Sequence, residues 1–148
     1  MDIEVRLATA HDRSALEEFY AREGKNFSDL STRAASTPVG ASLETMFIIA
    51  VTQGMVVAAL KLDIGKDPKI GRVGFVKYFE IEDDLEDTDL GKRMLEETVA
   101  LAEKKSLRAL DSLVPESRPD VIKIYQDSGF EVECKEIYLR RTFRPRVF

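Results

Sequence analysis

The residues from Ile81 to Leu95 constrain the fold more than any other stretch, because they join a predicted strand to a predicted helix through an acidic loop. The apolar run from Arg72 to Ile81 predicts the strand. Beyond the loop, apolar residues recur at helical spacing and predict a helix over 90–105. A second strand is predicted over 107–114. The apolar stripe of the helix consists of Met94, Leu95, Thr98, Val99, Leu101 and Ala102.

The loop itself admits two explanations from its residues alone. Asp87, Thr88 and Asp89 are good N-cap residues, and acidic side chains favour a helix N-terminus, so an acidic cap on a solvated loop needs no ligand. A calcium loop counted from Glu86 would place Gly91 sixth and Glu97 twelfth. Leu90 would then occupy a ligand position, and the first ligand would be Glu rather than Asp.

The rest of the chain predicts one mixed domain. Ile3 to Leu7 alternate as in a half-buried strand, and Thr9 with Asp12 predicts a capping box at the start of an amphipathic helix. Two apolar runs around residues 52–54 predict a hairpin buried on both faces. The remaining expected elements are a short helix near Leu30 to Ala35, a turn at Gly65 to Gly71, a helix around Val121 to Tyr125 ended by Ser128 and Gly129, and a last pair of strands within Phe130 to Phe143.

Charge and composition narrow the function classes. The net charge is −5, and the last nine residues hold four arginines and no acid, so the first 139 residues carry −9. An acidic body argues against general nucleic-acid binding. No apolar run reaches membrane-spanning length, and no secretory signal opens the chain. The single Cys134 cannot form an internal disulfide, which favours a reducing, cytoplasmic compartment. His11 is the only histidine, which excludes a His-based triad or metal cluster, and we expect it at the surface.

The stretch from Ile81 resembles the cofactor-binding segment of the GNAT superfamily of N-acetyltransferases, V-x-P-x-Y-Q/R-x-x-G-x-G-x-x-L-L. The residues that match or align are Ile81, Asp83, Leu85, Gly91, Met94 and Leu95. A second stretch resembles the family signature V-x-x-x-N-x-x-A-x-x-L-Y-x-x-x-G-F through Val114, Ile124, Tyr125, Gly129 and Phe130, with Arg118 in place of the Asn. Residues 6–19 resemble the family's opening, R-x-A-x-x-x-D before an amphipathic helix.

The resemblance implies an α/β (α+β) fold: a single GNAT-like domain over residues 1–148, with a mixed, mostly antiparallel sheet of six or seven strands and helices on both faces. The strands near 72–81 and 107–114 should run parallel, joined by the 90–105 helix. Acetyl-CoA is the implied co-substrate. Its implied contacts are Phe79, Ile81, Asp87, Thr88, Asp89, Leu90, Gly91, Lys92 and Arg118.

Two substitutions separate the loop from the family pattern. Glu86 stands where the family has Gln or Arg, and Asp89 stands at the first Gly. Each carboxylate about 6 Å from a phosphate charge would cost roughly 1–3 kcal/mol at an effective dielectric of about 20–40, and solvent and salt screen part of this. We therefore expect CoA to bind weakly or in an altered pose, while Lys92, Arg93 and Arg118 offset part of the repulsion.

The resemblance also implies catalytic roles. The family tyrosine at the position of Tyr125 often protonates the departing thiolate, and a phenol can donate a proton at neutral pH; the alternative is a core tyrosine on an amphipathic helix. Glu80 is a candidate general base, with a salt-bridged glutamate or a water chain as alternatives. Arg118 is otherwise a solvated residue before a helix.

Two functions follow as hypotheses. The first is an acyl-CoA-dependent N-acyltransferase that acts by direct attack of an amine on the thioester, with a small-molecule or protein acceptor. The second is an inactive GNAT-fold binding or regulatory module that has lost acetyl-CoA. The arginines of the C-terminal stretch, beside Phe143 and two further apolar residues, also suggest a homodimer in which the last strand or tail crosses to the second subunit.

Overall fold

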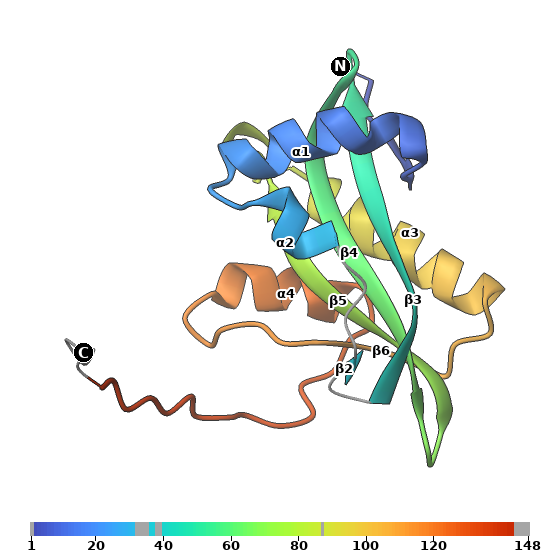
Figure 1. The fold of residues 1–148 in the computed structure, drawn as a ribbon, viewed down its shortest axis with the longest axis vertical. Helices are drawn as coiled ribbons and strands as arrows, with labels where there is room; N and C mark the ends of the chain where they lie inside the picture. Colours follow the sequence, from blue (N-terminus) through green and yellow to red (C-terminus); the bar gives the residue numbers. More distant parts are fainter. Residues whose placement is uncertain (1, 32–35, 38–39, 87, 144–148) are drawn as a thin grey trace, which may run out of the picture.

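The computed structural model describes residues 2–31, 36–37, 40–86 and 88–143. They form one α+β domain built on a six-stranded sheet with the order β1-β3-β4-β5-β6, and β2 pairs with β3 beside this path (Figure 1). In chain order the elements are β1 (Glu4–Leu7), a 3₁₀ turn η1 (Ala10–Asp12), α1 (Arg13–Arg22), α2 (Phe27–Ser31), β2 (Ser36–Thr37), β3 (Gly40–Thr52), β4 (Met55–Asp67), β5 (Gly71–Ile81), η2 (Asp83–Leu85), α3 (Leu90–Lys104), β6 (Ala109–Ser112) and α4 (Pro119–Asp127).

The sheet is antiparallel from β1 to β5 and parallel between β5 and β6. This confirms the predicted parallel pair, because α3 is the crossover between those two strands. The β3–β4 hairpin is also confirmed: Gln53 and Gly54 both have positive φ, 49° and 73°, as a two-residue hairpin turn requires. The following turn is tighter than predicted, since β4 extends to Asp67 and β5 begins at Gly71.

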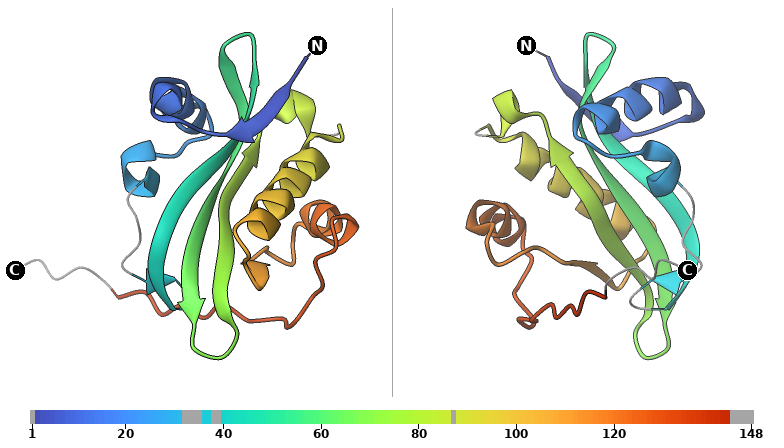
Figure 2. Two further views of the ribbon diagram at one scale, coloured as in Figure 1. Left: turned by 90° about the vertical axis from the view of Figure 1, so that its right-hand side faces the viewer. Right: turned by 60° about the vertical axis from the view of Figure 1, so that its left-hand side comes forward.

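Helices cover both faces of the sheet, as predicted (Figure 2, left). Strand β4 is buried from Val56 to Gly65, so it is the centre of both cores. On one face α1 and α2 bury an aromatic cluster against β3 and β4, whose rings belong to Phe19, Tyr20, Phe27 and Phe47. On the other face α3 and α4 pack on an aliphatic core that includes Leu60, Leu62, Ile64, Met94 and Leu95.

The region between α1 and the hairpin differs from the sequence prediction. A short helix does form there, but it begins at Phe27 and ends at Ser31 rather than starting at Leu30. Phe27 and Leu30 are buried in the aromatic core, and their burial rather than local propensity sets the position of the helix. The rest of the predicted helix, residues 32–35, lies outside the described residues.

The predicted last pair of strands is wrong for the described residues up to Phe143. From Glu131 to Phe143 the described chain has no strand partner, although apolar and aromatic residues recur in it. The sheet ends at β6, a strand of only four residues whose second edge no described strand covers. A strand needs a neighbour to satisfy its backbone hydrogen bonds, so sequence alone does not produce one.

The capping box at Thr9 and Asp12 is confirmed. The N–H of Thr9 donates to Asp12 Oδ2 at 2.7 Å, and the Arg6 guanidinium donates to both carboxylate oxygens at 2.7 and 2.8 Å. The hydrogen bonds from Arg6 hold the pKa of Asp12 well below its usual range. The group therefore ties β1 to the start of α1.

This carboxylate should make the fold sensitive to acid. Because the pKa of Asp12 is lower in the folded chain, its stabilisation is present above the unfolded value of about 4 and is lost as pH falls toward the folded value. Asp12→Asn should lower the free energy of unfolding at pH 7 by about 1 kcal/mol. Urea unfolding at several pH values measures this, and an equal loss at pH 7 and at pH 2.5 would contradict it.

Candidate active site

A cleft opens where β5 and β6 diverge. The two strands pair from Val73 opposite Ala109 to Val76 opposite Ser112, and β5 then continues to Ile81 paired with β4 but without β6. The space between them, about 320 Å³, is closed from behind by α4 and is called here the β5–β6 cleft. Its lining includes Lys25, Val76 to Ile81, Glu86, Ser112 to Pro115, Arg118, Asp120, Val121, Ile124 and Tyr125.

A bulge in β5 lies on the wall of this cleft. Lys77 pairs with Lys61 and Glu80 with Ala59, so two residues of β5 face one of β4, and Tyr78 adopts a φ of 51°. A tyrosine in this conformation stores strain that its surroundings must hold. The hydroxyl of Tyr20, fully buried in the aromatic core, donates to the Tyr78 carbonyl at 2.9 Å. The bulge interrupts the regular pairing with β4, and Tyr78 and Phe79 both line the cleft at this point.

Tyr125 projects from α4 into the same cleft. Its hydroxyl lies 3.0 Å from Ser112 Oγ, which in turn lies 3.1 Å from the Val76 carbonyl. The rings of Phe79 and Phe130 pack edge-on against it and fix its orientation. Burial raises the pKa of Tyr125, so the phenol keeps its proton at neutral pH and above. The residue is buried as a core tyrosine would be, and its hydroxyl also reaches the cleft.

Glu80 and Lys25 form a charge pair at the mouth of the cleft. Lys25 Nζ lies 3.3 Å from Glu80 Oε1, and about a third of each side chain is exposed. The salt-bridged state that sequence reasoning allowed for Glu80 is therefore present, within the cleft.

Glu23, which sequence reasoning missed, lies near this pair at the end of α1. Its pKa is raised, mainly by burial. Nearby negative charges raise it further, and they belong to Glu80, Asp83, Glu86 and Glu82. A carboxylate with a raised pKa holds a proton more readily, as a general base requires. No local motif marks it, because its acidic neighbours come from residues 80–86, at the end of β5 and in the loop that follows.

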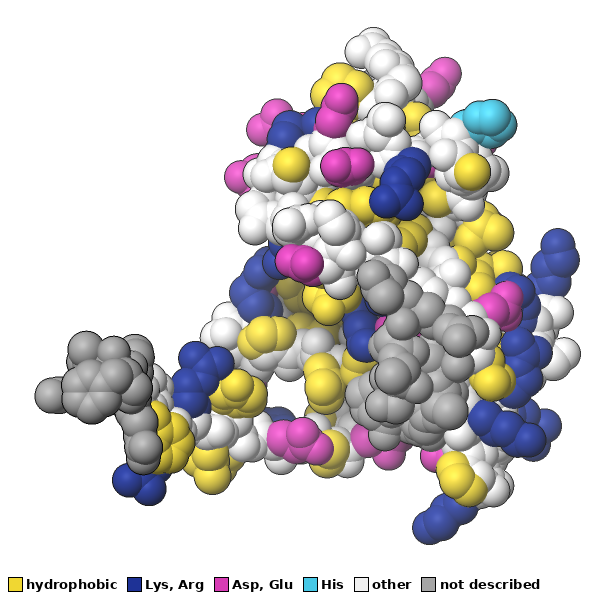
Figure 3. Space-filling view, in the orientation of Figure 1, with side chains coloured by type: hydrophobic (Ala, Val, Ile, Leu, Met, Phe, Trp, Pro, Cys, Tyr) yellow, Lys and Arg dark blue, Asp and Glu magenta, His cyan; other side chains and the backbone are white. Residues whose placement is uncertain are grey.

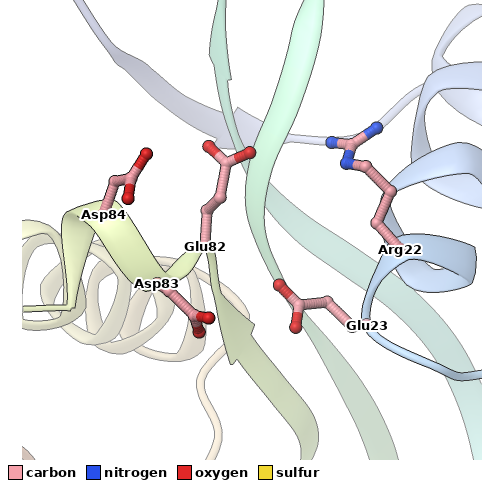
Figure 4. Close-up of a pocket in the computed structure, with 5 residues that line it drawn as sticks. All are labelled: Arg22, Glu23, Glu82, Asp83 and Asp84. Carbon is pink, nitrogen blue, oxygen red and sulfur yellow. The ribbon is translucent and has the colours of Figure 1, made fainter.

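Glu23 also borders a smaller cavity of about 280 Å³ between the end of α1 and η2 (Figure 4). Glu82, Asp83 and Asp84 face it from the end of β5 and from η2, and Arg22 faces it from α1. The Arg22 guanidinium donates to the Val56 carbonyl at 2.9 Å. Four carboxylates beside one arginine give this side of the cleft a negative field.

A buried charge network lies next to the cleft, on the sheet face that carries α1 and α2. Asp63 is fully buried, and its carboxylate lies 3.0 Å from Lys77 Nζ and 3.6 Å from Lys61 Nζ, while Thr45 Oγ1 donates to it at 2.6 Å. Burial lowers the pKa of Lys61. In the sequence, the signal for this network is the pair of charges, Lys61 and Asp63, that interrupts the apolar run of β4.

The predicted phosphate loop is already partly satisfied by its own side chains. Thr88 Oγ1 accepts the N–H of Leu90 at 3.2 Å and donates to the Leu85 carbonyl at 2.6 Å, so it caps the start of α3. Asp89 occupies the N-cap position with φ −80° and makes no capping hydrogen bond. Its backbone therefore does not need the glycine of the family pattern.

Leu90 and Gly91 are buried within the protein. A Cβ on Gly91 would lie 3.2 Å from side-chain atoms of both Ile124 and Ile81, so glycine at this position allows α3 to approach α4 and β5 closely. Close packing thus explains the glycine at this position of the family motif. Because both side chains are buried, a ligand could contact only the backbone of this turn.

The remaining predicted contacts divide between the cleft and the solvent. Phe79, Ile81 and Arg118 line the β5–β6 cleft, and so does Glu86. Arg118 pairs with Asp120 at 3.4 Å, which neutralises part of its charge. Lys92 is exposed and lies 3.8 Å from Glu96. Asp87 lies outside the described residues.

The described residues hold neither a metal site nor a membrane-spanning helix. No three His, Cys, Asp or Glu side chains among them are placed to share a metal ion. None of the helices in the described part of the chain has the length and apolar character needed to cross a membrane.

The structure is similar to solved acetyltransferases. It matches an acetyltransferase of Trypanosoma brucei with TM-score 0.70 and 18% identity, and a ribosomal-protein-alanine N-acetyltransferase from Brucella melitensis biovar Abortus 2308 with TM-score 0.72 and 18% identity, each over 95% of this chain and 100% of the other. It also matches the aminoglycoside N-acetyltransferase AAC(6')-Iy in complex with CoA, with TM-score 0.70 and 14% identity, over 95% of this chain and 100% of the other.

No protein-family model matches the sequence, and no curated protein matches it. At identities this low the structural likeness establishes the fold alone, which is the fold of these acetyltransferases. The fold expectation drawn from the motifs is thus confirmed.

The Tyr20 hydrogen bond gives a direct test of the bulge. Tyr20→Phe leaves the Tyr78 carbonyl without its donor and should lower the free energy of unfolding by about 1–2 kcal/mol, measured by urea denaturation. Tyr138→Phe, at a tyrosine that is 80% exposed, is the matched control and should change it by less than about 0.5 kcal/mol. Equal effects from the two variants would show that the bond does not hold the bulge.

Proposed function

We propose that this protein is an acyl-CoA-dependent N-acyltransferase, most simply an acetyltransferase, that transfers the acyl group directly to an amine. The observation that carries the proposal is the β5–β6 cleft, which is lined both by the buried Tyr125 and by the strained bulge at Tyr78 and Phe79. Similar structures include AAC(6')-Iy with a bisubstrate analogue of CoA and acetylneamine, which supports a thioester and an amine meeting in this fold.

The cleft residues divide the work of acyl transfer. The bulge at Tyr78 and Phe79 would supply backbone N–H groups to the thioester carbonyl, where negative charge develops. Glu80 or Glu23, directly or through water, would take the proton of the attacking amine. Tyr125, protonated because its pKa is raised, would give its proton to the departing thiolate, and Ser112 holds the hydroxyl in place.

The residues fit the two ends of acetyl-CoA unequally. The cleft suits the acyl-pantetheine arm, which can run along the free part of β5 as an added strand would. The phosphate end would meet Glu86 on the cleft wall, Asp89 at the helix start and a first amide already taken by Thr88. We therefore propose weak or displaced binding of the CoA phosphates.

The acceptor is an amine, either of a small molecule or of a protein. The carboxylates at residues 23 and 80–86 beside the cleft favour a cationic acceptor through long-range attraction. Similar structures include an aminoglycoside acetyltransferase from an uncultured soil metagenomic sample in complex with sisomicin, and a glucosamine-6-phosphate N-acetyltransferase from Arabidopsis thaliana. We also propose that the enzyme is cytoplasmic, because its single cysteine fits a reducing compartment, and that it forms a homodimer.

The acidic loop favours a second candidate function, a GNAT-fold binding or regulatory module without catalysis. A thermal-shift titration with acetyl-CoA separates the two, since a ligand that binds only the folded chain raises its melting temperature. A concentration-dependent rise up to millimolar acetyl-CoA supports the enzyme, and an unchanged melting temperature supports the module.

Replacing the two loop carboxylates should tighten binding of acetyl-CoA. Glu86→Gln with Asp89→Asn removes both charges without changing side-chain size, and calorimetry should show a dissociation constant about 10–100 times lower. S-Acetylpantetheine lacks the phosphates, so its affinity should stay within about twofold.

The matched control is Glu97→Gln with Glu103→Gln, which removes the same charge from exposed positions on α3. It should change acetyl-CoA binding by less than about threefold in moderate salt. If both double variants behave alike, net charge and not the loop limits the affinity.

Tyr125→Phe should lower turnover by about 10–10⁴-fold with an acceptor that gives measurable activity. Because the pKa of Tyr125 is raised, wild-type activity should not decline on account of this group until the pH exceeds about 10. The melting temperature of the variant is the control for folding. Full activity of the Phe variant would remove Tyr125 from the mechanism.

A further inference from the structure

The turn between α1 and α2 brings a primary amine into the β5–β6 cleft. The Nζ of Lys25 lies 3.3 Å from Oε1 of Glu80, a candidate general base, and Phe79 of the bulge lines the same cleft. An amine held close to a base has the arrangement of an activated nucleophile. Lys25 therefore places its amine where an acceptor amine would lie for acyl transfer.

The end of α1 fixes the backbone of Lys25 at this position. Gly24 adopts a φ of 76°, and the N–H of Lys25 donates to the carbonyl of Tyr20 at 2.8 Å, which together form a C-terminal cap. The hydroxyl of the same Tyr20 donates to the carbonyl of Tyr78. Tyr20 thus joins Lys25 to the bulge, while the flexible four-carbon side chain of Lys25 lets its amine move within the cleft.

Lys77 also lines the cleft, but its amine is committed to the protein interior. Its Nζ lies 3.0 Å from the carboxylate of the fully buried Asp63. Withdrawing this ammonium would leave a buried carboxylate with less compensating charge, which is strongly unfavourable. Glu80 is about a third exposed, so water can solvate it when Lys25 moves away. Of these two cleft lysines, Lys25 is the one whose amine can leave its partner at little cost.

We propose that Lys25 is itself an acyl acceptor, so that the protein acylates its own cleft with the acyl group of a bound acyl-CoA. The inference rests on the proposed acyltransferase function. Because amine and thioester would share a cleft of about 320 Å³, proximity favours their reaction over reaction with lysines elsewhere on the surface.

The step uses the groups already assigned to acyl transfer. Glu80 takes a proton from the ammonium of Lys25, and the resulting amine attacks the carbonyl carbon of the thioester. A C–N bond forms, the C–S bond breaks, and Tyr125 gives its proton to the departing thiolate. The nitrogen loses a second proton as the amide forms, and that proton restores Tyr125. The products are CoA and an amide on Lys25.

The amide changes the mouth of the cleft for the lifetime of the chain. An amide does not pass its acyl group to the next amine as a thioester does, so the transfer stops at one acyl group on this residue. Acylation also removes the positive charge of Lys25. The mouth of the cleft then becomes more negative by one charge, and the acyl group lies beside Glu80.

Mass spectrometry of the wild-type protein after incubation with millimolar acetyl-CoA tests the proposal, with S-acetylpantetheine as a donor that lacks the nucleotide phosphates. The chain should gain one acetyl group, and peptide mapping should place it on Lys25. Lys25→Arg keeps a cation beside Glu80 but has no lysine amine, so it should gain none there. The melting temperature of this variant is the control for its folding.

Exposed lysines on the same chain are the internal control. Figure 3 shows basic side chains that project from the surface, several of them at the side that carries α3. Lys92 and Lys135 are each paired with a glutamate outside the cleft, and their side chains are 53% and 74% exposed, against 34% for Lys25. Direct acetylation by the thioester would follow exposure and reach them first. Transfer within the cleft should instead modify Lys25 at least about tenfold faster than either.

Tyr125→Phe should slow acetylation of Lys25 by about tenfold or more and leave Lys92 and Lys135 unchanged, because only the cleft reaction uses the phenol. Acetylation that follows exposure, or an equal rate at Lys25 in both proteins, overturns the inference. A Lys25 that stays unmodified while acetyl-CoA raises the melting temperature overturns the inference alone. No rise with either donor and no modification would remove the proposed function together with it.

Discussion

The hydrogen-bond ladder between β5 and β6 ends at Val76 and Ser112. The candidate active site depends on this, because the cleft lies where the two strands separate. Three contacts keep the strands apart beyond this point. Tyr20 holds the bulge at Tyr78 from one face, and from the other the ring of Tyr125 stands against Phe79 while its hydroxyl meets Ser112. The same groups that part the strands therefore line the cleft.

The charge differs between the two sides of this cleft. Around Tyr125 the lining includes apolar side chains such as Phe79 and Ile124, while carboxylates from α1, β5 and η2 gather on the side of the cleft next to the smaller cavity. An amine that approaches as a cation is favoured by that field, whereas a diphosphate on the same side is not. This asymmetry is consistent with an acyltransferase whose affinity for CoA is limited by its own loop.

Motif spacing predicted the fold because each motif combines a turn residue with an apolar period. Gly91 fits only where α3 crosses close to Ile81 and Ile124, and Gln53-Gly54 fits only a tight hairpin. The last pair of strands predicted within Phe130 to Phe143 is absent from the described residues, because a strand depends on the edge it meets as well as on its own sequence. Glu23 and the Asp63 network escaped prediction because their partners are distant in sequence.

The sequence by itself determined the periodicities, the capping residues and the acidic loop, since these depend on neighbours within a few residues along the chain. It thereby set the order of strands and helices, the parallel β5–β6 pair through its crossover helix, and the position of Tyr125 on α4. Only the tertiary structure decided that Tyr20 would restrain Tyr78, that burial would raise the pKa of Tyr125, and that no described strand would cover the second edge of β6. Those features arise from contacts across the sheet, where burial and charge depend on residues far apart in the chain.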